Sequence, residues 1–194
     1  QLLAGKVPVL AAPDLYLNEH REYGLSTYSK HSDGTGVAIS SRLRPILNMR
    51  PKYRHWLSPS LWQLNADLHL TDWLEEKNFD FDVVTDEDLH IEGVDLLNRY
   101  RCVLTGSHPE YSSEKMLAAY ESYQLNGGRW IYLGSDGFYW ISEYHPDNTN
   151  IIEVRKGEAG TRAWTANPGE YNNAFDGKYG GMWRARGRIP SKVC

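Results

Sequence analysis

His108 and Glu110, two titratable side chains, flank Pro109 shortly before a predicted helix. The positive end of a helix dipole stabilises a carboxylate, so Glu110 is expected to be ionised and available to a metal ion or a proton. Tyr28 lies in a segment dense in polar groups, and tyrosine binds iron as a phenolate because a hard cation lowers the pKa of its hydroxyl. Both features also have plain interpretations: a surface histidine with a capping glutamate, and a tyrosine that only packs.

The common signatures of catalytic sites are missing from the sequence. It contains no HExxH zinc motif, no pair of CxxC motifs, no GxGxxG after a predicted strand and no GxxxxGK[ST] phosphate loop. The GxSxG nucleophile elbow is absent as well. Ser107 precedes His108 at a predicted strand end, so a serine nucleophile stays open as the weaker alternative, since neighbours in sequence seldom form a Ser–His dyad.

The elements that must position these residues alternate between strands and helices. Apolar residues recur at helical spacing in residues 57–77, which predicts a helix. Ser112 or Ser113 would cap a second helix, with Tyr120 and Tyr123 on its packing face and a stop at Gly127-Gly128. Strands are predicted at residues 7–12, 37–39, 79–84, 101–105, 130–133 and 151–155, an irregular segment at 13–36 and a turn at 86–88.

This order predicts an α/β fold with a mainly parallel sheet and helices on both of its faces. Ligands of such sheets bind beyond the carboxyl ends of the strands. Those ends carry the polar segments 85–87, 106–110 and 134–137. The sequence therefore predicts a site built from these three segments, and plain turns are the alternative.

Length and composition bound the class of protein. The 194 residues predict one α/β domain, residues 1–194, which we expect to be part of a longer chain. No run of 18 apolar residues could span a bilayer. The formal charge of −4 gives no overall reason to expect nucleic acid, although residues 40–56 carry five basic residues and no acid. Cys102 and Cys194 do not form a disulfide framework, which favours a reducing, cytoplasmic compartment.

Several motifs together resemble the large (beta) subunit of the N,N-dimethylformamidase family. They are YGLSTY at 23–28, SSRLRPILNMRPKY at 40–53, DEDLHIEG at 86–93, GSHPEY at 106–111 and GSDGFYW at 134–140. They occur in the family's order, and the resemblance covers most of residues 13–188. The resemblance implies a glutamine-amidotransferase-like (flavodoxin-like) domain without its cysteine nucleophile. It also implies an amidohydrolase that cleaves the linear C–N bond of small N-substituted formamides, such as N,N-dimethylformamide, to formate and an amine.

A mononuclear iron held by two tyrosines and one glutamate is also implied by the resemblance. By motif, Glu110 is the implied carboxylate ligand, Tyr28 is one implied tyrosine ligand, and Tyr16 is the best match for the other. The resemblance also implies a catalytic set of His108, Lys156 and Asp136. Two features depart from the family: asparagine usually stands where this chain has Asp136, and the segment between Tyr16 and Tyr28 is short.

The chemistry that follows is metal-assisted hydrolysis. Iron would polarise the formamide carbonyl as a Lewis acid, while His108 or a nearby carboxylate would handle the proton passed to the leaving amine. Phe138, Tyr139 and Trp140 would form aromatic walls for the N-alkyl groups. The resemblance suggests a small subunit and a higher oligomer as partners. Two alternatives remain: a metal-free hydrolase that uses Ser107 or Cys102, and a non-catalytic subunit that is degenerate or binds sugars.

Overall fold

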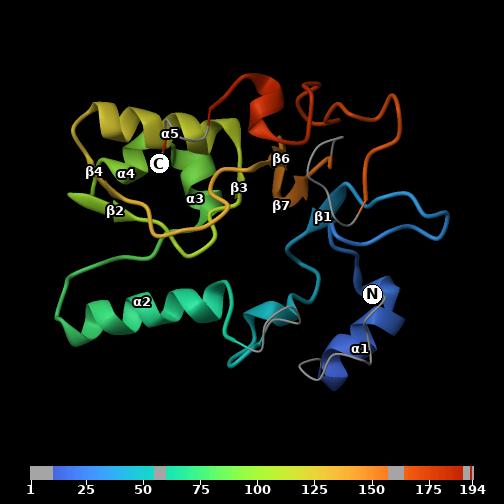
Figure 1. Ribbon diagram of the computed structural model, residues 1–194, viewed down its shortest axis with the longest axis horizontal. Coiled ribbons are helices and arrows are strands. Elements are labelled where there is room, and N and C mark those ends of the chain that lie inside the picture. Colours follow the sequence, from blue (N-terminus) through green and yellow to red (C-terminus); the bar gives the residue numbers. More distant parts are fainter. Residues whose placement is uncertain (1–10, 55–59, 157–163, 190–192, 194) are drawn as a thin grey trace. The chain divides into compact units, whose positions relative to one another are not determined.

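The computed structural model describes residues 11–54, 60–156, 164–189 and 193 (Figure 1). The chain divides into two compact units, which are treated separately here. The first contains residues up to Leu25 together with Arg42–Asp82, and the second contains Ser26–Ser41 and Val83–Cys194. The single-domain organisation stays a prediction. None of the described helices is long and apolar enough to cross a membrane.

The first unit is built on two helices, α1 (Ala12–Glu19) and α2 (Leu64–Glu76). The helix predicted at 57–77 is confirmed as α2, which begins later than predicted; residues 55–59 lie outside the described part. The irregular segment predicted from residue 13 is wrong at its start, because the Asp14 carboxylate accepts the Ala11 backbone N–H at 2.9 Å and so opens α1. Asp14 also pairs with Arg50 at 2.6 Å.

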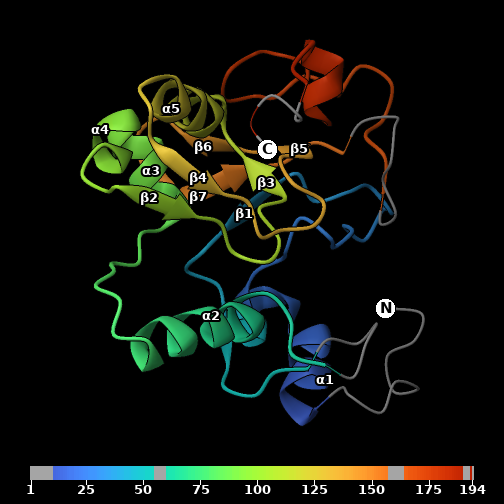
Figure 2. The ribbon, with the colours of Figure 1, turned by 60° about the vertical axis from the view of Figure 1, so that its left-hand side comes forward.

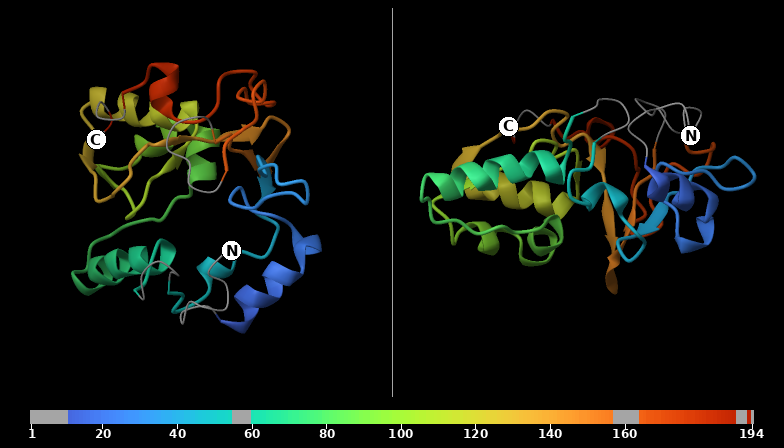
Figure 3. Two further views of the ribbon diagram at one scale, coloured as in Figure 1. Left: turned by 45° about the vertical axis from the view of Figure 1, so that its right-hand side comes forward. Right: turned by 90° about the horizontal axis from the view of Figure 1, so that it is seen from below.

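Three small sheets lie in the second unit. Two are parallel pairs: β2 (Cys102–Leu104) with β4 (Arg129–Ile131), and β3 (Tyr111–Ser112) with β5 (Trp140–Ile141). The third is antiparallel, in the order β1 (Ile39–Ser41), β7 (Asn148–Glu153), β6 (Glu143–His145). Figure 3 shows the β6–β7 hairpin, in orange, projecting from this unit. The fold is thus mixed α/β with some parallel strands, and its largest sheet is antiparallel.

Helices α3 (Asp86–Glu92), α4 (Val94–Leu97) and α5 (Glu114–Leu125) form the core with the β2–β4 sheet (Figure 2). Tyr120 and Tyr123 are buried on α5, as predicted, and the cluster includes Val103 and Trp130 from one face of the sheet. Ile131 lies on the other face and is exposed. Among the described residues of the second unit, helices therefore cover one face of this sheet and not both.

Several predicted boundaries are corrected by the structure. Residues 79–84 form no strand, and the turn predicted at 86–88 is the first turn of α3. The cause is a capping box in which the Thr85 hydroxyl accepts the Asp88 N–H at 3.2 Å and the Asp88 carboxylate accepts the Thr85 N–H at 2.9 Å. The strands predicted at 37–39 and 151–155 are shifted to β1 and β7. Of the strand predicted at 7–12, residues 7–10 lie outside the described residues, and Ala12 begins α1.

Candidate active site

Two loops at the carboxyl ends of β2 and β4 lie against each other, as expected for adjacent parallel strands. The Ser135 N–H donates to the Ser107 carbonyl at 3.0 Å, and the Phe138 N–H donates to the Pro109 carbonyl at 2.7 Å. Gly134 permits this approach, because a Cβ there would lie 2.3 Å from Cδ of Pro109. Two of the three segments predicted to form a site, 106–110 and 134–137, are thus brought together. The third predicted segment, 85–87, caps α3 instead.

Glu110 ends the first of these loops and is fixed from both sides. Its carbonyl accepts the N–H groups of Tyr139 and Trp140 at 3.0 and 2.9 Å, and the Trp140 side chain donates to its carboxylate. Burial raises the pKa of this carboxyl, and nearby Asp136 raises it further, while Lys156 acts in the opposite direction. This shift is opposite in direction to the one expected from a helix dipole, and β3 separates Glu110 from the start of α5.

Lys156 follows β7 and has only 1% of its surface exposed. Its ammonium lies over three aromatic rings, 4.2 Å from the centroid of Tyr28, 4.6 Å from that of Trp140 and 5.3 Å from that of Tyr111. Such faces attract a cation through the ring quadrupole. Burial lowers the pKa of Lys156 to about 8, against the opposing attraction of Glu110. Lys156 is thus mostly protonated at neutral pH, yet close to titration.

Tyr28 is held in the site by its neighbours in a tight turn. The Ser29 N–H donates to the Ser26 carbonyl at 2.8 Å, and the buried indole N–H of Trp164 donates to the Thr27 carbonyl at 2.8 Å. The Tyr28 hydroxyl is hydrogen-bonded to the hydroxyl of Tyr111. Because 55% of Tyr28 is exposed, this tyrosine forms the open side of the cluster.

Tyr111 is the site residue that sequence reasoning missed. It lies on β3, directly after Glu110, and its register partner on β5 is Trp140. Lys156 Nζ donates to its hydroxyl at 3.2 Å. Burial raises the pKa of Tyr111, and Tyr28 raises it further, so Tyr111 stays a neutral phenol. Its position in the HPEY motif was the available signal, but the pairing with Trp140 is not visible in the sequence.

His108 and Asp136 complete the group around Glu110. Both act on the pKa of the Glu110 carboxyl, His108 lowering it and Asp136 raising it, so both lie within electrostatic range. His108 Nδ1 lies 3.3 Å from Ser107 Oγ. Asp136 adopts a left-handed backbone conformation with φ 51°, which aspartate and asparagine tolerate better than most residues. The structure thus brings together five of the six predicted site residues.

Tyr16, the sixth, belongs to the first unit. Its ring stacks on His20 with centroids 4.0 Å apart, and its hydroxyl lies 3.5 Å from that of Tyr23. This hydrogen bond raises the pKa of Tyr16. The role of Tyr16 as a metal ligand stays a prediction.

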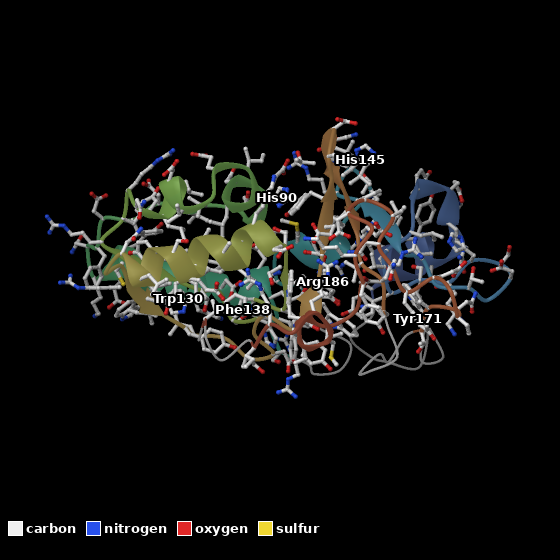
Figure 4. All side chains as sticks on the ribbon, turned by 90° about the horizontal axis from the view of Figure 1, so that it is seen from above. His90, Trp130, Phe138, His145, Tyr171 and Arg186 are labelled. Carbon is white, nitrogen blue, oxygen red and sulfur yellow. The ribbon has the colours of Figure 1, made fainter. Side chains whose placement is uncertain are left out.

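Phe138 is not a wall of the site, contrary to expectation. It is buried in the core, where its ring lies 5.3 Å from Tyr120 and 6.3 Å from Trp130. Figure 4 shows Trp130 and Phe138 along the same side of α5. Phe138 precedes β5 and has a left-handed backbone conformation with φ 52°, so its ring turns into the core while Trp140 lies beside the Lys156 ammonium. Trp140, with Tyr139 edge-on at 5.0 Å, is the aromatic wall.

The oxygen donors of this cluster suit a hard cation. Among the described residues, no group of three or more His, Cys, Asp and Glu side chains could hold a metal ion. A metal here would therefore depend on tyrosine oxygen besides the Glu110 carboxylate. Tyr28 presents such an oxygen, and phenolate with carboxylate is a donor set that fits iron.

Comparisons with known proteins converge on one family. The chain matches the family model described as "N,N-dimethylformamidase beta subunit-like, C-terminal" over residues 14–194. It is 50% identical over its whole length to the N,N-dimethylformamidase beta subunit of Paracoccus aminophilus. It is 48% identical, again over its whole length, to the subunit of the same name from Alcaligenes sp. The chain spans 25% of the length of each relative.

Proposed function

Because this chain belongs to the N,N-dimethylformamidase beta subunit-like, C-terminal family, we propose that it supplies active-site residues of an amidohydrolase. The substrates proposed are small N-substituted formamides such as N,N-dimethylformamide, cleaved to formate and an amine. A glutamine-amidotransferase-like architecture is part of the same proposal. The observation that carries it is the buried ammonium of Lys156, which lies among Glu110, Tyr28 and the aromatic wall at the strand ends.

A mononuclear iron is proposed as the cofactor, with Tyr28 and Glu110 as ligands in this unit. When bound, it would supply a Lewis acid that polarises the amide carbonyl. The fit rests on the hard oxygen donors of Tyr28 and Glu110.

Other side chains of this unit would stabilise charge, transfer a proton and contact the substrate. The Lys156 ammonium would stabilise negative charge that develops on the formamide oxygen, because a buried charge acts strongly where water is excluded. His108, whose Nδ1 contacts Ser107 Oγ, would deliver a proton to the departing amine nitrogen. Trp140 and Tyr139 would contact the N-alkyl groups. The relatives are named as beta subunits, so we propose a second, smaller subunit and a higher oligomer as partners.

Formate release from N,N-dimethylformamide by the full-length protein with its partner subunit tests this function. The Lys156→Met variant keeps the length of the side chain and removes its charge, and its kcat is expected to fall by about 100-fold or more, the scale of a lost charged donor. Lys178→Met is the matched control, because Lys178 pairs with Glu114 at the surface, and it should retain wild-type kcat. Wild-type kcat in Lys156→Met would contradict the proposal.

A metal-free hydrolase using Ser107 is the second candidate, favoured by the 3.3 Å contact between Ser107 Oγ and His108 Nδ1. Cys102, the other nucleophile considered, is a half-buried free cysteine on β2. Chelation separates the two functions. An iron enzyme loses activity with a chelator and regains it with iron, whereas a serine enzyme keeps its activity and is stopped by a serine-directed reagent.

A further inference from the structure

Tyr111 lies between two proposed active-site groups and touches both through one oxygen. Its hydroxyl accepts a hydrogen bond from Lys156 Nζ at 3.2 Å and is hydrogen-bonded to the hydroxyl of Tyr28. No role for Tyr111 follows from the implied ligand or catalytic set. The connection is long-range in sequence, since 83 residues separate Tyr28 from Tyr111 and 45 separate Tyr111 from Lys156.

The donor and acceptor inventory fixes the direction of the first bond, and iron binding would fix that of the second. An ammonium has three donors and no acceptor, so the protonated Lys156 can only donate to Tyr111. A tyrosine hydroxyl carries a single hydrogen. Either hydroxyl can donate in the Tyr28–Tyr111 bond, but Tyr28 as an iron-bound phenolate would carry no hydrogen, and Tyr111 would then be the donor. In that state the order would be Lys156 to Tyr111 to Tyr28, and Tyr28 would receive a hydrogen bond from a donor that is itself polarised by a buried cation.

The backbone holds Tyr111 firmly in this place. Tyr111 begins β3, whose next residue, Ser112, is fully buried and accepts the Trp183 indole N–H at 3.1 Å. The parallel partner of Tyr111 is Trp140, which is also a wall of the Lys156 cage. The Tyr111 ring is the most distant of the three rings around the ammonium, at 5.3 Å. The hydroxyl, more than the ring, is therefore its closest link to Lys156.

We propose that Tyr111 is a positioning residue that fixes the Lys156 ammonium and, by donating to Tyr28, sets the electron density on the oxygen of the proposed iron ligand. This inference rests on the proposed function. Tyr111 acts through Lys156 and Tyr28 and needs no contact with the substrate. The Tyr111→Phe variant isolates the effect, because it removes one oxygen and keeps the ring on β3.

Two measurements on the full-length protein test the proposal. In the iron-loaded protein, Tyr111→Phe should keep wild-type iron content, but the visible phenolate-to-iron absorption band should move to longer wavelength, because the Tyr28 oxygen loses a donor. Its kcat should fall on the order of tenfold, the scale of one hydrogen bond. In the metal-free protein, acylation of Lys156, followed by mass spectrometry, should be several-fold faster in Tyr111→Phe, since Nζ loses a partner.

Failure of the proposed function and failure of the inference about Tyr111 would give different results. A wild-type protein that is active without iron overturns the proposed function, whereas the metal-free labelling still tests the link between Tyr111 and Lys156. An unchanged band in Tyr111→Phe, or an unchanged labelling rate, overturns the present inference. If Tyr111→Phe does not fold, Lys156→Met interrupts the same chain at its start and should move the band in the same direction; an unmoved band there overturns it as well.

Discussion

Glu143 offers a prediction that depends on the fold of the second unit and not on the chemistry of the site. Its carboxylate on β6 shares Arg186 with Asp176, at 3.3 and 3.0 Å from the guanidinium nitrogens. It also faces a pocket of about 370 Å³ lined by His90, Glu114, Lys115, Asp176 and Lys178. Figure 4 marks Arg186 and His90 in this region. Burial, followed by repulsion from Asp176, raises the pKa of Glu143 to about 7, although Arg186 opposes the shift.

The sign and size of the effect follow from linkage. The unfolded chain ionises Glu143 near 4.5 and the folded chain near 7, so the unfolded state releases this proton first as the pH rises. Stability from this group is fully present below pH 4.5 and is lost between about pH 4.5 and 7. The shift corresponds to about 3 kcal/mol in the free energy of unfolding. Because only 12% of the side chain is exposed, solvent screening should remove little of it.

Urea unfolding of the wild type and Glu143→Gln at pH 4.5 and 7.5 measures the effect. The variant should gain about 2–3 kcal/mol relative to the wild type over this interval, since glutamine has no proton to release. Glu121→Gln is the control, because it removes a carboxylate on α5 that forms an ion pair with Arg188. The pH dependence of its stability should run parallel to that of the wild type. Parallel curves for the wild type and Glu143→Gln would refute the reasoning.

Three further substitutions probe how the site is positioned. Gly134→Ala should destabilise the protein by about 1–3 kcal/mol and lower kcat, because its Cβ would meet Pro109 between His108 and Glu110; unchanged unfolding in urea would contradict this. Asp136→Asn should stabilise the metal-free protein by about 0.3–1 kcal/mol, since it keeps a side chain tolerated at φ 51° and removes repulsion of Glu110; a lower melting temperature would refute it. Thr85→Ala should cost about 1 kcal/mol by removing the α3 cap, measured by urea unfolding, with no loss expected if the cap is not formed.

The parts of the fold that the sequence predicted best are those with a strong local signal. Helix α5 was placed by its serine cap and its Gly-Gly stop, and the parallel pair β2–β4 by two apolar runs on either side of it. The strand predicted at residues 79–84 was wrong because an alternation of apolar and polar residues also suits an extended loop. Helix α3 was missed because the three acidic residues of its first helical turn were interpreted as a loop, although Thr85 before them is a favourable N-cap.

The candidate site shows the same division between local and long-range information. Glu110, His108 and Asp136 were predicted at strand ends because the carboxyl ends of parallel strands meet at one edge. Tyr28 was singled out by the polar segment around it, whereas Lys156 was named only through the family resemblance, since nothing near it in the sequence indicates a buried cation. Tyr111 could not be found, because its importance comes from pairing with Trp140 across two short strands. Phe138 was misassigned because its left-handed backbone conformation, which turns the ring into the core, is not visible in the sequence.

Iron content measured together with formate release is the most direct test of the central claim. The metal-replete, full-length wild type should contain about one iron per chain, absorb visible light through its tyrosine ligand and release formate from N,N-dimethylformamide. Glu110→Ala should lose iron, colour and activity together, because the proposed carboxylate ligand is removed. A wild type that hydrolyses the amide without iron, or a Glu110→Ala variant that holds iron at wild-type occupancy, would contradict the assignment of this cluster as the metal-dependent active site.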